Sequence, residues 1–233
     1  MRILALDTAT SACSAALWRD GSVCARRLAR MERGQSEALM PMILDVLAEA
    51  GCGFSQLDLL AVTVGPGAFT GLRIGLAAAR GMALASGVPC LGVTTLEAVA
   101  HGVPEGERAA DPLLVALDTR RADVYAQVFA PDLGPLGPPQ ALPPGALGGL
   151  VPARRILVAG DAAARAAGAL AEAGVTVTLS AAPGLPDAAT VAGLAARRWR
   201  PGEPVDPPAP LYLRPPQAKA ATGGGRRAGG GGG

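Results

Sequence analysis

Short apolar runs separated by turn residues open the chain and predict three neighbouring antiparallel strands. The runs are Ile3 to Leu6, Cys13 to Trp18 and Ser22 to Arg27. Asp20-Gly21 separates the second run from the third, and Asp-Gly between apolar runs is a strong hairpin signal. A buried strand is also predicted at 57–64, where an apolar stretch ends in β-branched residues. The first part of the chain therefore forms a sheet.

Two predicted helices in this part carry more apolar or small residues than one sheet-facing stripe requires. The segment 36–50 is apolar on two faces, and 68–86 is rich in Ala and Leu and contains no proline. In the second segment Gly71, Gly75 and Ala79 recur at every fourth position and share one face. An interior glycine costs about 0.5–1 kcal/mol relative to alanine, so a packing purpose is expected. We therefore expect these helices to pack against a second layer of helices from another chain.

A strand and its acidic turn occur twice in the chain. Ala5-Leu6-Asp7-Thr8 is repeated 111 residues later as Ala116-Leu117-Asp118-Thr119, and the surrounding apolar pattern repeats too. Two copies of a strand-hairpin lobe are the build of the actin–Hsp70–sugar-kinase (ASKHA) fold. In that fold a nucleotide lies in the cleft between the lobes. The predicted fold class is therefore α/β, with two lobes that each contain a mixed sheet.

Three segments are predicted from the order of elements and from composition. Residues 1–106 form a first lobe with the partner-binding helices, and 107–200 form a second, more divergent lobe. Within the second lobe, 131–152 is rich in Pro and Gly and is expected to be irregular. A last helix at 188–199 is expected to be capped by Asp187. The Pro- and Gly-rich segment 201–233 is expected to be disordered beyond about residue 219.

Composition bears on several classes of protein. The net charge is +2 and the basic residues are scattered, which by itself gives no nucleic-acid footprint. No window holds 18 uninterrupted apolar residues, so no membrane span is expected. The four cysteines lack metal-type spacing and are typical of small core residues in a reducing compartment. We therefore expect a cytoplasmic protein.

Asp7 and Asp118 are the best candidates for contact with a phosphate or a metal, although an Asp at such a turn also caps its own backbone. Thr8, Thr10 and Gly160 would complete a vestigial nucleotide cleft. Active members of the ASKHA fold usually have glycine two residues after this aspartate, where this chain has Ala9 and Arg120. His101 is the single histidine, so a two-histidine metal site cannot form. A Ser-His-Asp triad would have to use His101. We expect no catalytic residue and no bound metal.

The segment Gly65–Gly75, GPGAFTGLRIG, resembles the hallmark GPGSFTGLRIG of the TsaB (YeaZ) family. The start MRILALDTAT, the segment RGQSEALMPMILDVL and the late PLYLRPPQAK resemble other recurrent segments of that family. The resemblance covers most of residues 1–130 and again 205–219. It implies a non-catalytic subunit that binds the catalytic TsaD-like paralogue and supports formation of threonylcarbamoyladenosine next to the anticodon of tRNA. The metal-binding His-x3-His pair of TsaD cannot be formed by one histidine.

The resemblance also implies further partners and a site. A TsaE-like ATPase is expected in the complex, a homodimer when the chain is alone, and contact with tRNA only through the complex. No cofactor is required, with at most a weak ATP or ADP contact at the complex interface. The predicted partner face consists of Leu39, Met42, Ile43, Val46, Gly71, Leu72, Arg73, Gly75, Ala78, Ala79 and Met82. Two alternatives stay open, an actin-like-fold kinase or ATPase acting on a small molecule and a homodimer with a regulatory role.

Overall fold

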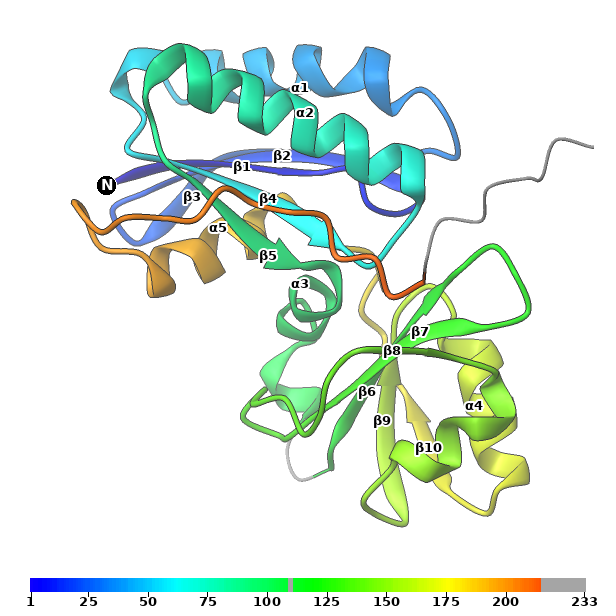
Figure 1. Ribbon diagram of the computed structural model, residues 1–233. Coiled ribbons are helices and arrows are strands. Elements are labelled where there is room, and N and C mark those ends of the chain that lie inside the picture. The colour runs from blue at the N-terminus through cyan, green and yellow to red at the C-terminus, as the bar shows by residue number, and fades with distance from the viewer. Residues whose placement is uncertain (109–110, 215–233) are drawn as a thin grey trace, which may run out of the picture.

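Two five-stranded mixed sheets build the two lobes of the structure, a computed structural model that describes residues 1–108 and 111–214 (Figure 1). The first sheet has the order β3-β2-β1-β4-β5 and the second the order β10-β9-β6-β7-β8. The strands of the first sheet are β1 (Arg2–Asp7), β2 (Ala12–Arg19), β3 (Ser22–Arg30), β4 (Leu59–Gly65) and β5 (Cys90–Thr94). Those of the second are β6 (Leu113–Asp118), β7 (Val124–Phe129), β8 (Gln140–Leu142), β9 (Arg155–Ala159) and β10 (Thr176–Leu179).

The predicted repeat is confirmed by the pairing of the strands. In the first sheet β1 is antiparallel to β2 and parallel to β4, and in the second β6 is antiparallel to β7 and parallel to β9. Asp7 pairs with Ser14 at the turn of the first hairpin, and Asp118 pairs with Val124 at the turn of the second. The predicted fold class, a two-lobed α/β protein, is therefore correct.

Helices cover both faces of the first sheet. The α-helices of the described residues are α1 (Gln35–Glu49), α2 (Phe69–Ser86), α3 (Thr95–His101), α4 (Ala163–Glu172) and α5 (Ala188–Arg198). Short 3-10 turns lie at Phe54–Gln56, Glu105–Glu107 and Pro144–Leu150. Helices α1 and α2 lie side by side on one face and α5 lies on the opposite face (Figure 1). Leu4, Leu6 and Val62 point into the α1–α2 core, while Ile3 and Ala61 point into the α5 core. The sheet therefore buries side chains on alternate sides, as its central strands require.

The predicted boundary of the second lobe, 107–200, is wrong at its end. Helix α5 lies within the predicted second lobe in sequence, but it packs on β1 and β2 of the first sheet. Its predicted cap is confirmed, because Asp187 accepts a hydrogen bond from the N–H of Ala189 at 2.9 Å. The N–H of Ala188 also donates to Ser14 Oγ at 3.0 Å, which ties the helix start to the first sheet. The buried face of α5 consists of Ala188, Val191, Ala192, Leu194 and Ala195.

One other segment is more ordered than predicted, and the start of the C-terminal segment packs on the first lobe. The stretch 131–152 contains β8, which pairs with β7 as an edge strand, and the 3-10 turn Pro144–Leu150. Residues 201–214 return along the first lobe, where the N–H of Leu211 donates to Val64 O at 2.7 Å. Arg80 of α2 donates to the carbonyl of Pro208 at 2.6 Å. The predicted disorder beyond residue 219 lies outside the described residues.

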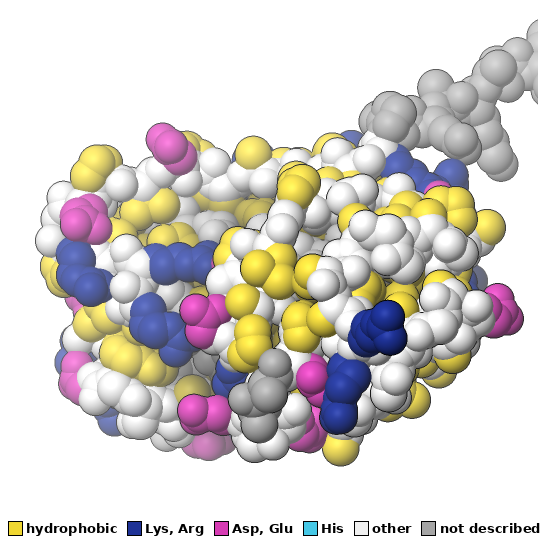
Figure 2. Space-filling view, turned by 90° about the horizontal axis from the view of Figure 1, so that it is seen from below, with side chains coloured by type: hydrophobic (Ala, Val, Ile, Leu, Met, Phe, Trp, Pro, Cys, Tyr) yellow, Lys and Arg dark blue, Asp and Glu magenta, His cyan; other side chains and the backbone are white. Residues whose placement is uncertain are grey.

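Charged side chains do not form a single stripe on the face seen in Figure 2, where basic and acidic groups are intermixed. None of the helices in the described residues is long and apolar enough to cross a membrane.

Candidate functional site

Asp7 lies at the end of β1 in the position of a phosphate- or metal-binding carboxylate, but it is completely buried. Its Oδ1 accepts hydrogen bonds from Thr63 Oγ1 at 2.6 Å and from the N–H of Ala9 at 3.1 Å. Its Oδ2 has no hydrogen-bond partner among the described residues. Burial raises the pKa of Asp7 from about 3.8 to about 7, because a charged carboxylate loses its hydration there. The carboxyl group therefore resists ionisation below about pH 7.

The glycine turn and the start of α2 fill the space beside this carboxyl. A Cβ on Gly67 would overlap the carbonyl oxygen of Ala9, and one on Gly71 would overlap that of Thr8. Thr8 Oγ1 donates to the carbonyl of Gly71 at 2.7 Å, and a Cβ on Gly75 would lie 2.6 Å from Thr8 Oγ1. These glycines therefore let α2 approach the β1–β2 turn of its own lobe.

This close approach corrects the predicted partner face. The line of Gly71, Gly75 and Ala79 points toward the sheet, and all three residues are buried. Seven of the predicted face residues lie inside the fold, whereas Arg73 is exposed and three methionine or alanine side chains are half-buried against the core. The buried residues are Leu39, Ile43, Val46, Gly71, Leu72, Gly75 and Ala79, and the half-buried ones are Met42, Ala78 and Met82.

The outward faces of α1 and α2 carry apolar side chains that the sequence analysis did not select. Leu44 is 52% exposed and Met40 40% on α1, and Leu84 is 88% exposed on α2. In Figure 1 the two helices form the outermost layer above the first sheet. The i, i+4 spacing of Met40 and Leu44 marks a second apolar face of α1, and this spacing could have identified the two residues from the sequence.

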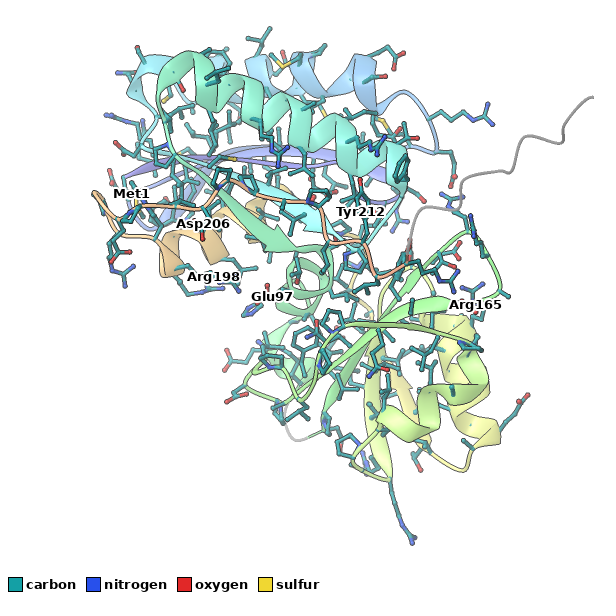
Figure 3. The ribbon with its side chains drawn as sticks, viewed as in Figure 1. Met1, Glu97, Arg165, Arg198, Asp206 and Tyr212 are labelled. Carbon is teal, nitrogen blue, oxygen red and sulfur yellow. The ribbon has the colours of Figure 1, made fainter. Side chains whose placement is uncertain are left out.

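In the second lobe, a backbone N–H group and a basic side chain donate hydrogen bonds to the carboxylate of Asp118. Its Oδ1 accepts from the N–H of Arg120 at 3.0 Å and from Arg165 Nη2 at 3.1 Å. Arg165, labelled in Figure 3, reaches Asp118 from α4. A Cβ on Gly160 would overlap the carbonyl oxygen of Ala116, so this glycine lets its turn approach β6. Asp118 therefore serves a local network in its own lobe.

Arg120 joins the two predicted halves of the cleft. Its Nη2 donates to Ser11 Oγ at 2.6 Å and lies 2.7 Å from a carboxylate oxygen of Glu32. Thr10 Oγ1, in the same turn as Ser11, is buried and has no partner among the described residues. The fold thus brings the turns that carry Asp7, Thr10 and Asp118 to one interface, where an arginine side chain lies between them.

His101 has no catalytic partner in this arrangement. Burial and the neighbouring Arg197 lower the pKa of His101 to about 4, and Arg197 Nη2 lies 3.4 Å from its Nδ1. Burial raises the pKa of Cys13 to about 11 and that of Cys90 to about 12, which disfavours reactive thiolates. Within the described residues no three His, Cys, Asp or Glu side chains are grouped so that they could hold a metal ion.

Comparison with known proteins decides the family. The model of the family described as TsaD, tRNA N6-adenosine threonylcarbamoyltransferase, matches residues 29–131. The solved structure of YeaZ from Pseudomonas aeruginosa is 32% identical, with a TM-score of 0.76 over 91% of this chain and 99% of that chain. The chain belongs to the TsaB (YeaZ) family.

Other relatives and one structural neighbour match this chain to different extents. The tRNA threonylcarbamoyladenosine biosynthesis protein TsaB of Escherichia coli is 43% identical over 54% of this chain and 53% of its own length. The chain thus aligns with about half the length of this curated TsaB protein. An uncharacterized protein of Mycobacterium tuberculosis is 35% identical over 93% of both chains. The hexokinase of Thermus thermophilus, 16% identical with a TM-score of 0.51, shares the fold.

Proposed function

We propose that this chain is a non-catalytic subunit in the formation of threonylcarbamoyladenosine on tRNA, and that it acts by binding a catalytic TsaD-like protein. The names of its TsaB relatives support the pathway. The exposed apolar side chains on the outer faces of α1 and α2 support the binding role. A TsaE-like ATPase, a homodimer of the free chain and a weak nucleotide contact at the complex interface belong to the same proposal.

The state of the two acidic turns favours a binding role over catalysis. Asp7 is enclosed and resists ionisation, and Asp118 already accepts two hydrogen bonds. A kinase or ATPase of this fold needs carboxylates that reach the phosphates or their metal. We therefore expect the purified chain to hydrolyse ATP no faster than the uncatalysed background. ATP turnover that is lost in Asp7→Asn would favour the kinase alternative and would contradict a non-catalytic subunit.

The partner face that we propose consists of Met40, Leu44 and Leu84, with Ala77 and Gly81, which share the face of α2 that carries Leu84. Met40 and Leu44 lie one helical turn apart on α1, while Leu84 and Gly81 lie on α2. Two helices from each subunit would then form a four-helix contact. Apolar side chains this exposed favour burial in a partner interface, because each removes apolar surface from water.

Replacement of Leu44 by aspartate is expected to prevent formation of the complex. A carboxylate buried in an apolar contact loses its hydration and finds no partner, so we expect binding to weaken at least about a hundred-fold. The measurement is co-expression of the chain with its TsaD-like protein, followed by affinity capture and size determination of the complex.

Leu179→Asp is the matched control, because Leu179 is also 52% exposed but lies on β10 of the second lobe. This variant is expected to form the complex normally. If Leu179→Asp blocks the complex and Leu44→Asp does not, the second lobe contains the interface. If the wild-type chain forms no complex at all, the proposed partner is wrong.

A further inference from the structure

We propose that a cavity between the lobes binds an unpaired nucleotide of RNA directly. The inference deepens the proposed function and rests on it for the identity of the RNA. The cavity has a volume of about 460 Å³ and lies among the start of α2, the β6–β7 turn and the C-terminal segment around Tyr212. Figure 3 shows Tyr212 where this segment passes between α2 and the second lobe. Neither Asp7 nor Asp118 lines it.

Aromatic side chains are concentrated in this cavity. The chain has seven aromatic residues, and Phe69, Tyr125 and Tyr212 all line the cavity, including both tyrosines of the protein. The rings of Phe69 and Tyr212 are 5.7 Å apart, and the guanidinium of Arg73 lies 3.7 Å from the centre of the Phe69 ring. Arg73 Nε also donates to Tyr212 Oη at 3.3 Å. These contacts hold two partly exposed rings as a tilted pair, with 33° between their planes, at the cavity.

Proteins bind unpaired bases by stacking them on exposed aromatic side chains. Every base has a flat π face, so a ring that is already positioned gains a stacking contact whatever the sequence. Phe69 is 45% exposed and Tyr212 39%, although both are large apolar rings that burial would stabilise. A base stacked on Tyr212 would extend the Arg73–Phe69–Tyr212 series by one ring.

The polar side chains of the cavity suit the phosphate of the same nucleotide. Arg120, Arg121 and Arg214 line it, and no acidic side chain does. Arg120 also pairs with the carboxylate of Glu32, and Arg214 with that of Asp123. A guanidinium has five N–H donors, so these ion pairs hold it in position and leave donors for a phosphate. The first turn of α2, which begins at the cavity, has no side-chain cap on its N–H groups.

The balance of these groups predicts how binding responds to salt. Because carboxylates offset the charge of Arg120 and Arg214, stacking supplies most of the affinity, and a site for a single nucleotide neutralises about one phosphate. For single strands, log K is then expected to fall with log salt concentration with a slope of about −0.7. A long basic groove would give a slope several times steeper.

The test is a fluorescence anisotropy titration of the full chain with a labelled RNA stem-loop, a blunt RNA duplex of equal length and AMP as competitor. We expect the stem-loop to bind and the duplex to bind much more weakly. Tyr212→Ala should weaken stem-loop binding about five- to a hundred-fold, the range that loss of one stacked base gives. Tyr212→Phe retains the ring and should bind within about threefold of wild type.

Matched controls separate this site from general charge and from folding. Arg214→Gln should weaken stem-loop binding, whereas Arg154→Gln, at an exposed arginine beside β9, should not. If Tyr212→Ala lowers the melting temperature, Tyr212→Leu keeps the bulk without the flat ring and should show the same loss of RNA affinity. Equal binding of duplex and stem-loop, an unchanged affinity of Tyr212→Ala, or displacement of the stem-loop by AMP at equal concentration would each overturn the proposal.

Failure of this site and failure of the proposed function have different signatures. Tyr212→Ala is expected to form the complex with the TsaD-like protein as wild type does. A chain that binds its partner but shows no ring-dependent RNA binding would leave the proposed function standing and would reject the RNA site. A chain that binds the stem-loop but no TsaD-like protein would reject the proposed function.

Discussion

Gly71→Ala is expected to leave little folded protein. The added Cβ would overlap the carbonyl oxygen of Thr8, which is backbone and cannot move aside like the end of a long side chain. The turn that contains Thr8 is held by the hydrogen bond from Thr8 Oγ1 to Gly71 O and by that from the N–H of Ala68 to Ala9 O, at 2.8 Å. Overpacking of a core costs about 1–3 kcal/mol, and an overlap with backbone lies at or beyond the upper end. That is a large part of the stability of a typical domain.

Gly81→Ala in the same helix is the control. A Cβ at Gly81 meets nothing within 4 Å in the described part of the chain, and alanine favours a helix by about 0.8–1 kcal/mol over glycine. We expect Gly81→Ala to raise the urea midpoint slightly, while Gly71→Ala yields aggregated protein or a strongly lowered midpoint. Equal midpoints for the two variants would mean that the glycine line of α2 faces outward after all.

The local elements were predictable because their signals are local. Asp20-Gly21 between apolar runs predicts the β2–β3 hairpin, and the repeat around Asp7 and Asp118 predicts two hairpins of the same kind. Asp187 at the start of the last helix predicts a cap, which the structure contains. Each of these depends on a few neighbouring residues and on backbone preferences that tertiary contacts do not override here.

Orientation and long-range packing were not predictable from the same patterns. A line of small residues on α2 fits a second helix and a tight turn of its own sheet equally well, and only the fold shows that Gly71 meets Thr8. Helix α5 follows the second lobe in sequence but packs on the first sheet. Its sequence predicts an apolar face but does not indicate which sheet covers that face. The cavity around Tyr212 joins the segments 67–70, 119–125 and 211–214, which are distant in the sequence, so no local motif marks it.

Asp7→Asn is expected to stabilise the protein at pH 8. The variant retains a carbonyl oxygen that can accept from Thr63 Oγ1 and from the N–H of Ala9, the two contacts of Oδ1. It removes an ionisable group at a site where burial raises the pKa from about 3.8 to about 7. A rise of this size corresponds to a free energy on the order of 4 kcal/mol. For a chain of this length that is roughly 8–16 °C in melting temperature.

The sign follows from proton binding in the two states. Between about pH 4 and pH 7 folded Asp7 keeps its proton while unfolded Asp7 has lost it, so the folded state binds more protons and stability falls as pH rises. His101 works in the opposite direction. Its folded pKa of about 4 lies below the usual 6.5, so stability is lost as pH falls below about 6.5. The wild-type profile therefore contains two opposing contributions, and the difference between wild type and Asp7→Asn isolates the carboxyl.

The measurement is the free energy of unfolding in urea at intervals between pH 5 and pH 8. The advantage of Asp7→Asn over wild type should grow with pH and level off above about pH 7. His101→Gln, the control, should retain the pH dependence of stability that Asp7 causes. It should lose the pH dependence that His101 causes below pH 6.5. A variant that is less stable than wild type at pH 8 would show that the ionised Asp7 carboxylate is stabilised in the folded protein and not penalised by burial. Because Oδ2 has no partner among the described residues, such a result would point to a cation or a phosphate-bound metal at that oxygen, and the acidic turn would regain a functional role.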